Sequence, residues 1–242
     1  MKHQKLLITL SILFITVALI LAVFVVYTGI YYKADASAIE AFDYSGFETV
    51  TLDDGTIALV PSVSYDTGII FYPGGKVEYT AYLPLMRCLA SQGVLCLLTD
   101  MPFNLAVLDI NRADGLRDGY KQVESWYMAG HSLGGSMACS YVADKASEFD
   151  GVILLASYST EDLSQTGLSV LSIYGSNDRV LNSVSYTENK SNLPQGTVEY
   201  IIEGGNHAYF GTYGEQDGDG EATVTNREQI EITAEQIIKF IG

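Results

Sequence analysis

Ser132 is the residue whose neighbours most clearly indicate chemistry. It is the central residue of Gly-His-Ser-Leu-Gly at 130–134, which follows an apolar run at 126–129 and opens a helical pattern over about 133–146. Glycines two residues before and after the serine allow a strand to turn sharply into a helix, so that the hydroxyl projects beyond the end of a sheet. The motif also arises by chance, and the strand and helix around it are the context that its mechanism requires. The pattern predicts Ser132 as a nucleophile.

The base for such a serine must come from three histidines. A serine hydroxyl is a weak nucleophile, and an imidazole normally activates it. The histidines of the chain are His3, His131 and His207. A long apolar segment separates His3 from the rest, and His131 is adjacent in sequence to Ser132, so we do not expect its ring to turn back onto the serine oxygen. His207 follows the last expected strand, and elimination predicts it as the base.

A carboxylate must hold the imidazole in one tautomer, and Asp178 is the acid that we expect in this role. It follows the apolar run 169–175, and the chain order Ser132, Asp178, His207 is the one that accompanies a serine on a strand-to-helix turn. The structural alternative for Asp178 is a turn residue that caps the next segment. Three other acids also lie near strand ends: Glu203, Asp100 and Asp162.

An acyl-transfer site also needs hydrogen-bond donors for the negatively charged oxygen of its intermediate. One donor is expected to be the backbone N–H of Leu133, the residue after the nucleophile. The other is expected from the turn Pro73-Gly74-Gly75-Lys76, where we favour the N–H of Gly75 and place Lys76 second. Pro-Gly-Gly is also ordinary turn chemistry, and the two interpretations are compatible.

These residues need an architecture that brings strand ends to one edge. Strands are expected at 47–52, 56–62, 68–72, 94–98, 126–129, 151–156, 169–175 and 197–202. Helices are expected at 78–91, 133–146 and 226–241, with an interrupted helix over 104–122. A hairpin followed by alternating strands and helices predicts an α/β domain, with a mostly parallel twisted sheet and helices on both faces. Ligands of such sheets bind beyond the carboxyl ends of the strands.

The N-terminus predicts one transmembrane helix. Residues 6–26 contain no charge, proline or glycine, and at ~1.5 Å per residue they span ~30 Å, the thickness of a bilayer core. Lys2 and Lys5 precede this segment and tyrosines follow it, which places the N-terminus in the cytoplasm and the rest of the chain on the extracytoplasmic side of the cell membrane. The alternative is a signal peptide cleaved near Ala-Ser-Ala at 36–38, although its apolar core would be unusually long.

The expected organisation is therefore a cytoplasmic tip and transmembrane anchor at 1–33, a spacer at 34–46 and one domain at 47–242. A hydrophobic content of 48% with 17% charged residues excludes a disordered chain. The chain carries 13 basic and 29 acidic side chains, and an excess of negative charge this large argues against nucleic acid as a partner.

No cofactor or metal is expected. The three cysteines, Cys88, Cys96 and Cys139, lie in apolar stretches without a Cys/His cluster, which is typical of buried thiols rather than of a zinc site. The acidic segment 217–221 partly resembles a calcium loop, but Ala222 stands where such a loop needs glycine. A solvated acidic turn is the favoured interpretation, and calcium stays the alternative.

The chain resembles the α/β-hydrolase family, and specifically its small lidless members related to dienelactone hydrolases. The resemblance covers about 47–242 and is carried by FYPGGKVEY, GHSLGGSMA, YGSNDRV and the segment 204–220. It implies a hydrolase that acts through Ser132, Asp178 and His207. Dienelactone hydrolases have cysteine at the nucleophile position, so their substrate is not carried over. Only the short segment 157–168 separates two strands where related enzymes insert a lid, which implies an open site.

The sequence thus predicts a membrane-anchored serine hydrolase that cleaves a carboxylic ester, either small or lipid-like, through an acyl-enzyme. The same three side chains would also support a thioesterase, an amidase or an acyltransferase. A non-catalytic anchored binding domain is the alternative from another class, and the intact set of three argues against it.

Overall fold

The computed structural model describes residues 2–242, and its contacts divide the chain into two units, residues 1–31 and 32–242. The first unit contains helix α1 (Lys2–Gly29). Within it, Thr9–Gly29 is long and apolar enough to cross a membrane, by length and composition alone. A signal sequence near an N-terminus meets the same two criteria. The expected apolar helix is therefore present.

The second unit is built on one sheet of eight strands. The strands are β1 (Phe47–Thr51), β2 (Ile57–Pro61), β3 (Thr67–Tyr72), β4 (Leu95–Leu98), β5 (Ser125–His131), β6 (Gly151–Leu155), β7 (Ser169–Gly175) and β8 (Val198–Ile202). Their order across the sheet is β1-β2-β4-β3-β5-β6-β7-β8. Strand β2 runs antiparallel to both β1 and β4, and every other neighbouring pair is parallel.

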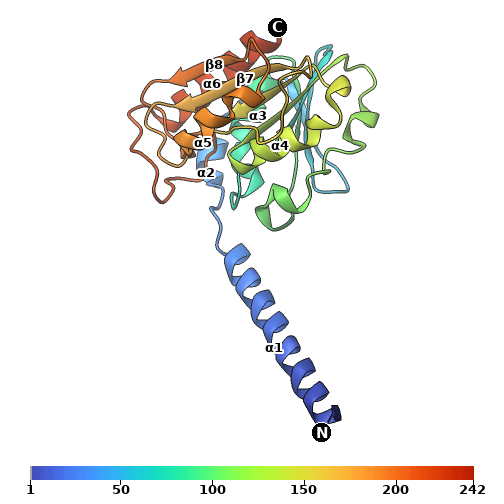
Figure 1. Cartoon of the computed structure of the whole chain (residues 1–242). Coiled ribbons are helices and arrows are strands. Elements are labelled where there is room, and N and C mark those ends of the chain that lie inside the picture. The colour runs from blue at the N-terminus through green and yellow to red at the C-terminus, as the bar shows by residue number, and fades with distance from the viewer. Residues whose placement is uncertain (1) are drawn as a thin grey trace. The chain divides into compact units, whose positions relative to one another are not determined.

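Helices cover both faces of this sheet (Figure 1). Helices α3 (Leu83–Ala90) and α6 (Asn226–Ile241) pack on one face, where alternate strand residues such as Ile69 and Phe71 point. Helix α4 (Leu133–Ala143) packs on the opposite face, against the residues in between, such as Ile70. This alternation buries strands on both sides, as a parallel sheet requires. The predicted fold class is confirmed.

The region 104–122, expected to be an interrupted helix, contains no α-helix. It contributes short 3₁₀ turns, Pro102–Asn104, Ala106–Leu108 and Leu116–Gly119. Gly115 has a positive φ of 76° at the start of the last turn, a conformation that interrupts a right-handed helix. A short helix α5 (Ser183–Glu188), which the sequence pattern did not indicate, follows β7.

The segment 34–46, expected to be a spacer, packs onto the domain. It contains helix α2 (Ala36–Glu40), whose N-terminus is capped by the Asp35 carboxylate through the N–H groups of Ser37 and Ala38. Ile39 and Phe42 lie three residues apart and are only 6% and 3% exposed. Because these apolar side chains gain free energy on leaving water, the segment is part of the domain rather than a free linker.

Candidate active site

Ser132 occupies the turn between β5 and α4, and its backbone is strained there. Its φ of 51° and ψ of −122° lie in a region that residues with a side chain rarely adopt. Two bonds hold it in place: the Ser132 N–H donates to the Leu155 carbonyl at 2.9 Å, and the Ser157 hydroxyl donates to the Ser132 carbonyl at 2.7 Å. The turn is thereby fixed to the end of β6.

The glycines around Ser132 are required by close packing of the backbone. A Cβ atom on Gly134 would overlap the carbonyl oxygens of Tyr72 and Pro73, and one on Gly130 would overlap the backbone of Gly134. Backbone cannot move aside as the end of a flexible side chain can. The spacing seen in the sequence therefore reflects the contact between β5, α4 and the end of β3.

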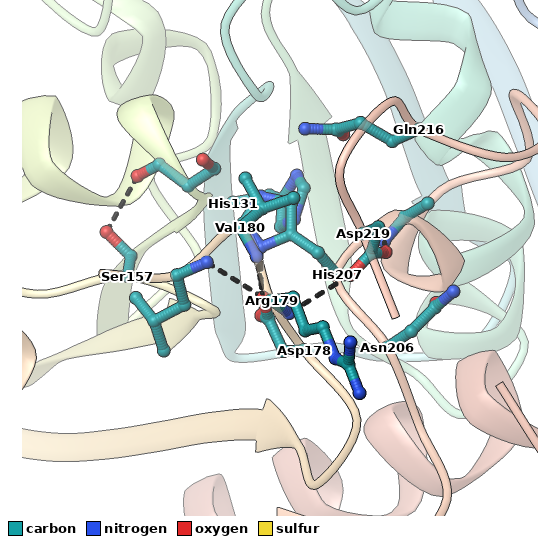
Figure 2. A network of polar contacts seen from close by, with 12 residues as sticks. His131, Ser157, Asp178, Arg179, Val180, Asn206, His207, Gln216 and Asp219 are labelled. Atoms are coloured by element: carbon teal, nitrogen blue, oxygen red, sulfur yellow. Dashed lines mark hydrogen bonds and ion pairs between the residues drawn. The ribbon is translucent and has the colours of Figure 1, made fainter. Parts of the chain in front are cut away.

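His207 and Asp178 form a buried pair beyond the ends of β8 and β7. The His207 Nδ1 lies 2.9 Å from Asp178 Oδ2, and both side chains are 2% exposed (Figure 2). The other carboxylate oxygen, Oδ1, accepts the backbone N–H groups of Val180 at 2.9 Å and Leu181 at 2.8 Å. A carboxylate held in this way accepts the Nδ1 proton, which leaves the Nε2 lone pair available to take a proton.

The structure distinguishes Asp178 from the other acids that the sequence allowed. Glu203 is exposed, Asp162 caps the Ser164 amide, and Asp100 lies against Gly55. Within the described residues 2–242, none of these three acids forms a hydrogen bond or ion pair with His207. Within residues 2–242 the Ser132 hydroxyl makes no hydrogen bond. In free enzymes the hydrogen bond between a catalytic serine and its histidine commonly tightens only when substrate is bound.

Two backbone amides are free to bind a negatively charged oxygen. The Lys76 N–H, the second choice from sequence, donates to the Asn104 carbonyl at 2.7 Å and is occupied. Within residues 2–242 the N–H groups of Gly75 and Leu133 have no hydrogen-bond partner. The two residues are neighbours in space, since a Cβ on Gly75 would lie 2.9 Å from the Leu133 Cδ2 atom. The Gly75 and Leu133 amides therefore suit this role better than that of Lys76.

The buried Tyr82 connects the turn at Gly74 with His131 at the end of β5. The Tyr82 hydroxyl accepts the Gly74 N–H at 3.1 Å and lies 2.8 Å from Nδ1 of His131. The His131 ring stacks against His207 with their centroids 4.5 Å apart. Burial lowers the pKa of His131 well below its ordinary value, and the neighbouring His207 lowers it further, while the His207 backbone has a smaller opposing effect. His131 is thus a neutral support beneath His207.

The segment that carries His207 is fixed by polar residues that sequence reasoning missed. Gln229 of α6 is fully buried, accepts the Asn206 N–H at 3.0 Å and donates to the Asn206 carbonyl at 2.7 Å. The Asp219 carboxylate accepts the N–H of Ala208 at 2.9 Å and that of Arg179 at 3.3 Å. Ala208 follows His207 in the chain and Arg179 follows Asp178, so one side chain joins both loops.

A cavity of about 250 Å³ opens beside Ser132. It is lined by Ser132, Leu133, Ser136, Ala156, Ser157, Tyr158, Val180, Leu181 and Asn182. Larger hollows of about 620 and 570 Å³ exist elsewhere on the domain, but Ser132, Asp178 and His207 line neither. No helix or strand is inserted between β6 and β7, so the described chain has no lid at this position.

The acidic segment after His207 has a structural role in this arrangement. Among the residues described, no group of three or more His, Cys, Asp or Glu side chains is placed to hold a metal ion. Asp219 instead points its carboxylate at backbone N–H groups, including that of Gly220 at 2.8 Å. The three cysteines, expected to be buried thiols, are free and buried.

Comparison with known proteins agrees with this fold. The family model described as "Alpha/beta hydrolase family" matches residues 68–231. The chain therefore belongs to the alpha/beta hydrolase family, as its motifs indicated. Among curated proteins, no sequence matches this chain significantly.

Solved structures show the same fold at low sequence identity. A "predicted CIB-like hydrolase" from Thermoplasma acidophilum is 18% identical with a TM-score of 0.54, over 80% of this chain and 98% of that one. Est1E from Butyrivibrio proteoclasticus is 16% identical with a TM-score of 0.57, over 81% and 99%. TT1662 from Thermus thermophilus is 15% identical with a TM-score of 0.59, over 81% and 95%. At such identities the likeness concerns the fold alone.

Proposed function

We propose that this hydrolase is a serine esterase in which Ser132 is the nucleophile, His207 the base and Asp178 the orienting acid. The observation that carries the proposal is the buried pair of His207 and Asp178, at 2.9 Å, on the sheet edge where Ser132 occupies its strained turn. The unpaired N–H groups of Gly75 and Leu133 are the hydrogen-bond donors that the oxyanion of acyl transfer requires.

The reaction follows from these positions. The Nε2 atom of His207 takes the Ser132 hydroxyl proton while Oγ attacks the ester carbonyl, and the Gly75 and Leu133 amides stabilise the resulting oxyanion. Collapse of this intermediate breaks the ester bond, and the imidazolium returns its proton to the leaving alcohol. Water then attacks the acyl-enzyme with the same base, which releases the carboxylic acid and restores Ser132.

The cavity supports a small acyl or alcohol group as its occupant. Its volume of about 250 Å³ lies below the range of roughly 300–1,000 Å³ usual for sites that hold drug-sized ligands. Apolar side chains of Leu133, Val180 and Leu181 line it, which suits a short hydrocarbon chain. The remainder of the ester, small or lipid-like, would extend into solvent from an edge without a lid.

We further propose that α1 anchors the enzyme, with the N-terminus in the cytoplasm and the domain on the extracytoplasmic face of the cell membrane. The support is the 21-residue apolar stretch Thr9–Gly29 and the lysines at 2 and 5 that precede it. Protease added to intact cells should digest the domain, and carbonate washing should leave the full-length chain in the membrane fraction. Mature protein in the medium beginning near Ile39 would contradict anchoring.

The test of the catalytic proposal is covalent labelling by a fluorophosphonate, with hydrolysis of p-nitrophenyl butyrate measured alongside. The wild-type chain should be labelled and active, and Ser132→Ala should lose both. Ser140→Ala, which changes a serine within α4, is the matched control and should keep both labelling and activity. Labelling that persists in Ser132→Ala would overturn the assignment of the nucleophile.

The same assay separates the other reactions that the three side chains would support. Matched butyrate ester, thioester and amide substrates should be cleaved in that order of preference if the enzyme is an esterase. Faster cleavage of the thioester or the amide would identify that bond type as the substrate class, and the assignment of Ser132, His207 and Asp178 would be unchanged. A chain that is neither labelled nor active on any of the three would indicate a binding domain.

A further inference from the structure

The residues immediately before α2 contact both loops of the proposed active site. Tyr32 forms an isolated parallel bridge with Val77. Its N–H donates to the Lys76 carbonyl at 2.8 Å, and its carbonyl accepts the Glu78 N–H at 2.9 Å. These bonds secure the chain directly after Gly75, whose amide is one of the two proposed oxyanion donors.

The same segment reaches the loop that carries His207. The Tyr32 hydroxyl accepts the Asp217 N–H at 3.2 Å, and its ring packs on Tyr213 with centroids 5.6 Å apart. Three residues later, the Asp35 N–H donates to the Thr212 carbonyl at 2.9 Å. All three contacts fall within the loop 207–219.

A further hydrogen bond connects Ala34 to the segment 76–78, which follows Gly75. The Ala34 N–H donates to Glu78 Oε2 at 3.1 Å. Residues 32–35, which we call the strap, therefore bind alternately to the segment 76–78 and to the loop 207–219. Tyr32 and Ala34 are half-buried and pack against the hydrophobic core, whereas Lys33 and Asp35 are exposed.

We propose that the strap is a positioning element of the active site, with Tyr32 as its central residue. This rests on the proposed function, since it concerns the same serine, base and oxyanion donors. By holding 76–78 against 207–219, the strap keeps the Gly75 amide at a fixed distance from His207. Oxyanion stabilisation depends on such fixed placement, because a donor that must reorganise during the reaction contributes less.

The strap should affect turnover more than stability. Another bond, from the Thr212 N–H to the Ala81 carbonyl at 2.8 Å, links the loop 207–219 to the turn Tyr79–Tyr82, which directly follows 76–78. The domain core therefore stays joined when the strap is loosened, whereas the turn at Gly75 gains freedom. A chain cut near Ala36-Ser37-Ala38 would lose the strap entirely, so that release from α1 and loss of turnover would occur together.

The experiment compares proline substitutions at two adjacent tyrosines in the full chain, purified in detergent. Proline has no N–H, so Tyr32→Pro removes both the bond to Lys76 and the ring on Tyr213. Tyr31→Pro is the matched control, because within residues 2–242 the Tyr31 N–H has no partner. Tyr32→Ala and Tyr32→Phe keep the backbone donor and remove the side-chain contacts in steps.

The readouts separate positioning from folding. For Tyr32→Pro we expect kcat to fall about tenfold, a fraction of the roughly 10²–10³-fold effect of losing one oxyanion donor outright. The inhibition constant of a butylboronic acid, which forms a tetrahedral adduct with the serine, should rise by a similar factor. The KM, the thermal midpoint and the values for Tyr31→Pro should stay close to wild type. Tyr32→Ala should lie between, and Tyr32→Phe should recover most of the activity.

Each other outcome overturns the inference. If the wild type is active and Tyr32→Pro and Tyr31→Pro have the same kcat and the same boronate affinity, the positioning role of the strap is rejected. The proposed function then remains in place. If Tyr32→Pro does not fold, Tyr32→Ala decides in the same way. A thermal midpoint that falls while kcat per folded molecule is unchanged would make the strap merely structural. A wild-type chain without any hydrolysis would reject the proposed function and the strap with it.

Discussion

The hydroxyl of Tyr82 lies 2.8 Å from Nδ1 of His131, and the same oxygen accepts the Gly74 N–H at 3.1 Å. Burial raises the pKa of Tyr82 well above its ordinary value, so the group remains a neutral hydroxyl. One oxygen thereby connects the last residue of β5, next to Ser132, with the turn that supplies the Gly75 amide. Its position matters for stability and for catalysis together.

Removing that hydroxyl should be costly. Tyr82→Phe leaves the buried Gly74 N–H and His131 Nδ1 without this partner, and a buried unsatisfied polar group costs about 1–3 kcal/mol. We expect the free energy of unfolding to fall by that amount and kcat to fall with little change in KM. Urea titration and steady-state kinetics measure the two effects. Tyr79→Phe, on the same turn, is the control, and a Tyr82→Phe variant as stable as that control would contradict the prediction.

His131 should make the folded state sensitive to acid. Burial lowers the pKa of His131 well below its ordinary value of 6.5, so the unfolded chain takes up a proton that the folded domain resists. The stability contributed by a neutral His131 is therefore complete above about pH 6.5 and is lost as the pH falls below it. The loss is at most about 1.4 kcal/mol per pH unit for one proton.

The measurement is the urea midpoint of wild type and His131→Asn between pH 7.5 and pH 5.5. The asparagine Oδ1 stands near the place of Nδ1 and still accepts from Tyr82, so the variant removes the titration and keeps that bond. We expect the free energy of unfolding of the variant to change less with pH over this interval. Parallel pH profiles for the two proteins would show that His131 does not titrate on unfolding.

The sequence carries a usable signal where a motif is local or a residue type is rare. The glycines around Ser132 are required where β5, α4 and the end of β3 meet, and the prediction of His207 as the base follows from a count of three histidines. Tyr82 and Gln229 could not be found in this way, because their partners lie 8 to 49 residues away for Tyr82 and 23 for Gln229. A polar residue on the apolar face of α6 was the one available signal for Gln229.

The strap and the region 104–122 escaped prediction for another reason. Residues 32–35 have no apolar periodicity, and most of their hydrogen bonds to 76–78 and to the loop 207–219 use their own backbone groups, which every sequence has. The turn Pro102–Asn104 has positive φ values at Phe103 and Asn104, and a phenylalanine gives no local signal for this conformation. In both places tertiary contacts, rather than local propensity, decide the conformation.

Asp178→Asn should lower kcat/KM by about 10³–10⁴-fold with a near-native fold. The amide cannot replace the carboxylate as partner of both His207 and the Val180 and Leu181 amides, and the imidazole is then held in the wrong tautomer. Steady-state kinetics with a circular dichroism check measures this. Glu203→Gln, which alters an exposed acid after the neighbouring strand, should behave like wild type. A loss at Glu203 with none at Asp178 would reassign the acid.

Asp219 should matter as a link between loops and not as a ligand of calcium. Its carboxylate accepts the Ala208, Gly220 and Arg179 N–H groups, and Asp219→Asn turns one of the two oxygens into a donor that faces a donor. We expect the free energy of unfolding to fall by about 1–3 kcal/mol and kcat to fall with it, because Ala208 follows His207 and Arg179 follows Asp178. Asp217→Asn is the control in the same loop, since within residues 2–242 that side chain has no hydrogen bond. Both variants should respond identically to EDTA and to added calcium. If calcium stabilised the wild type and either substitution abolished that effect, the loop would be a cation site instead.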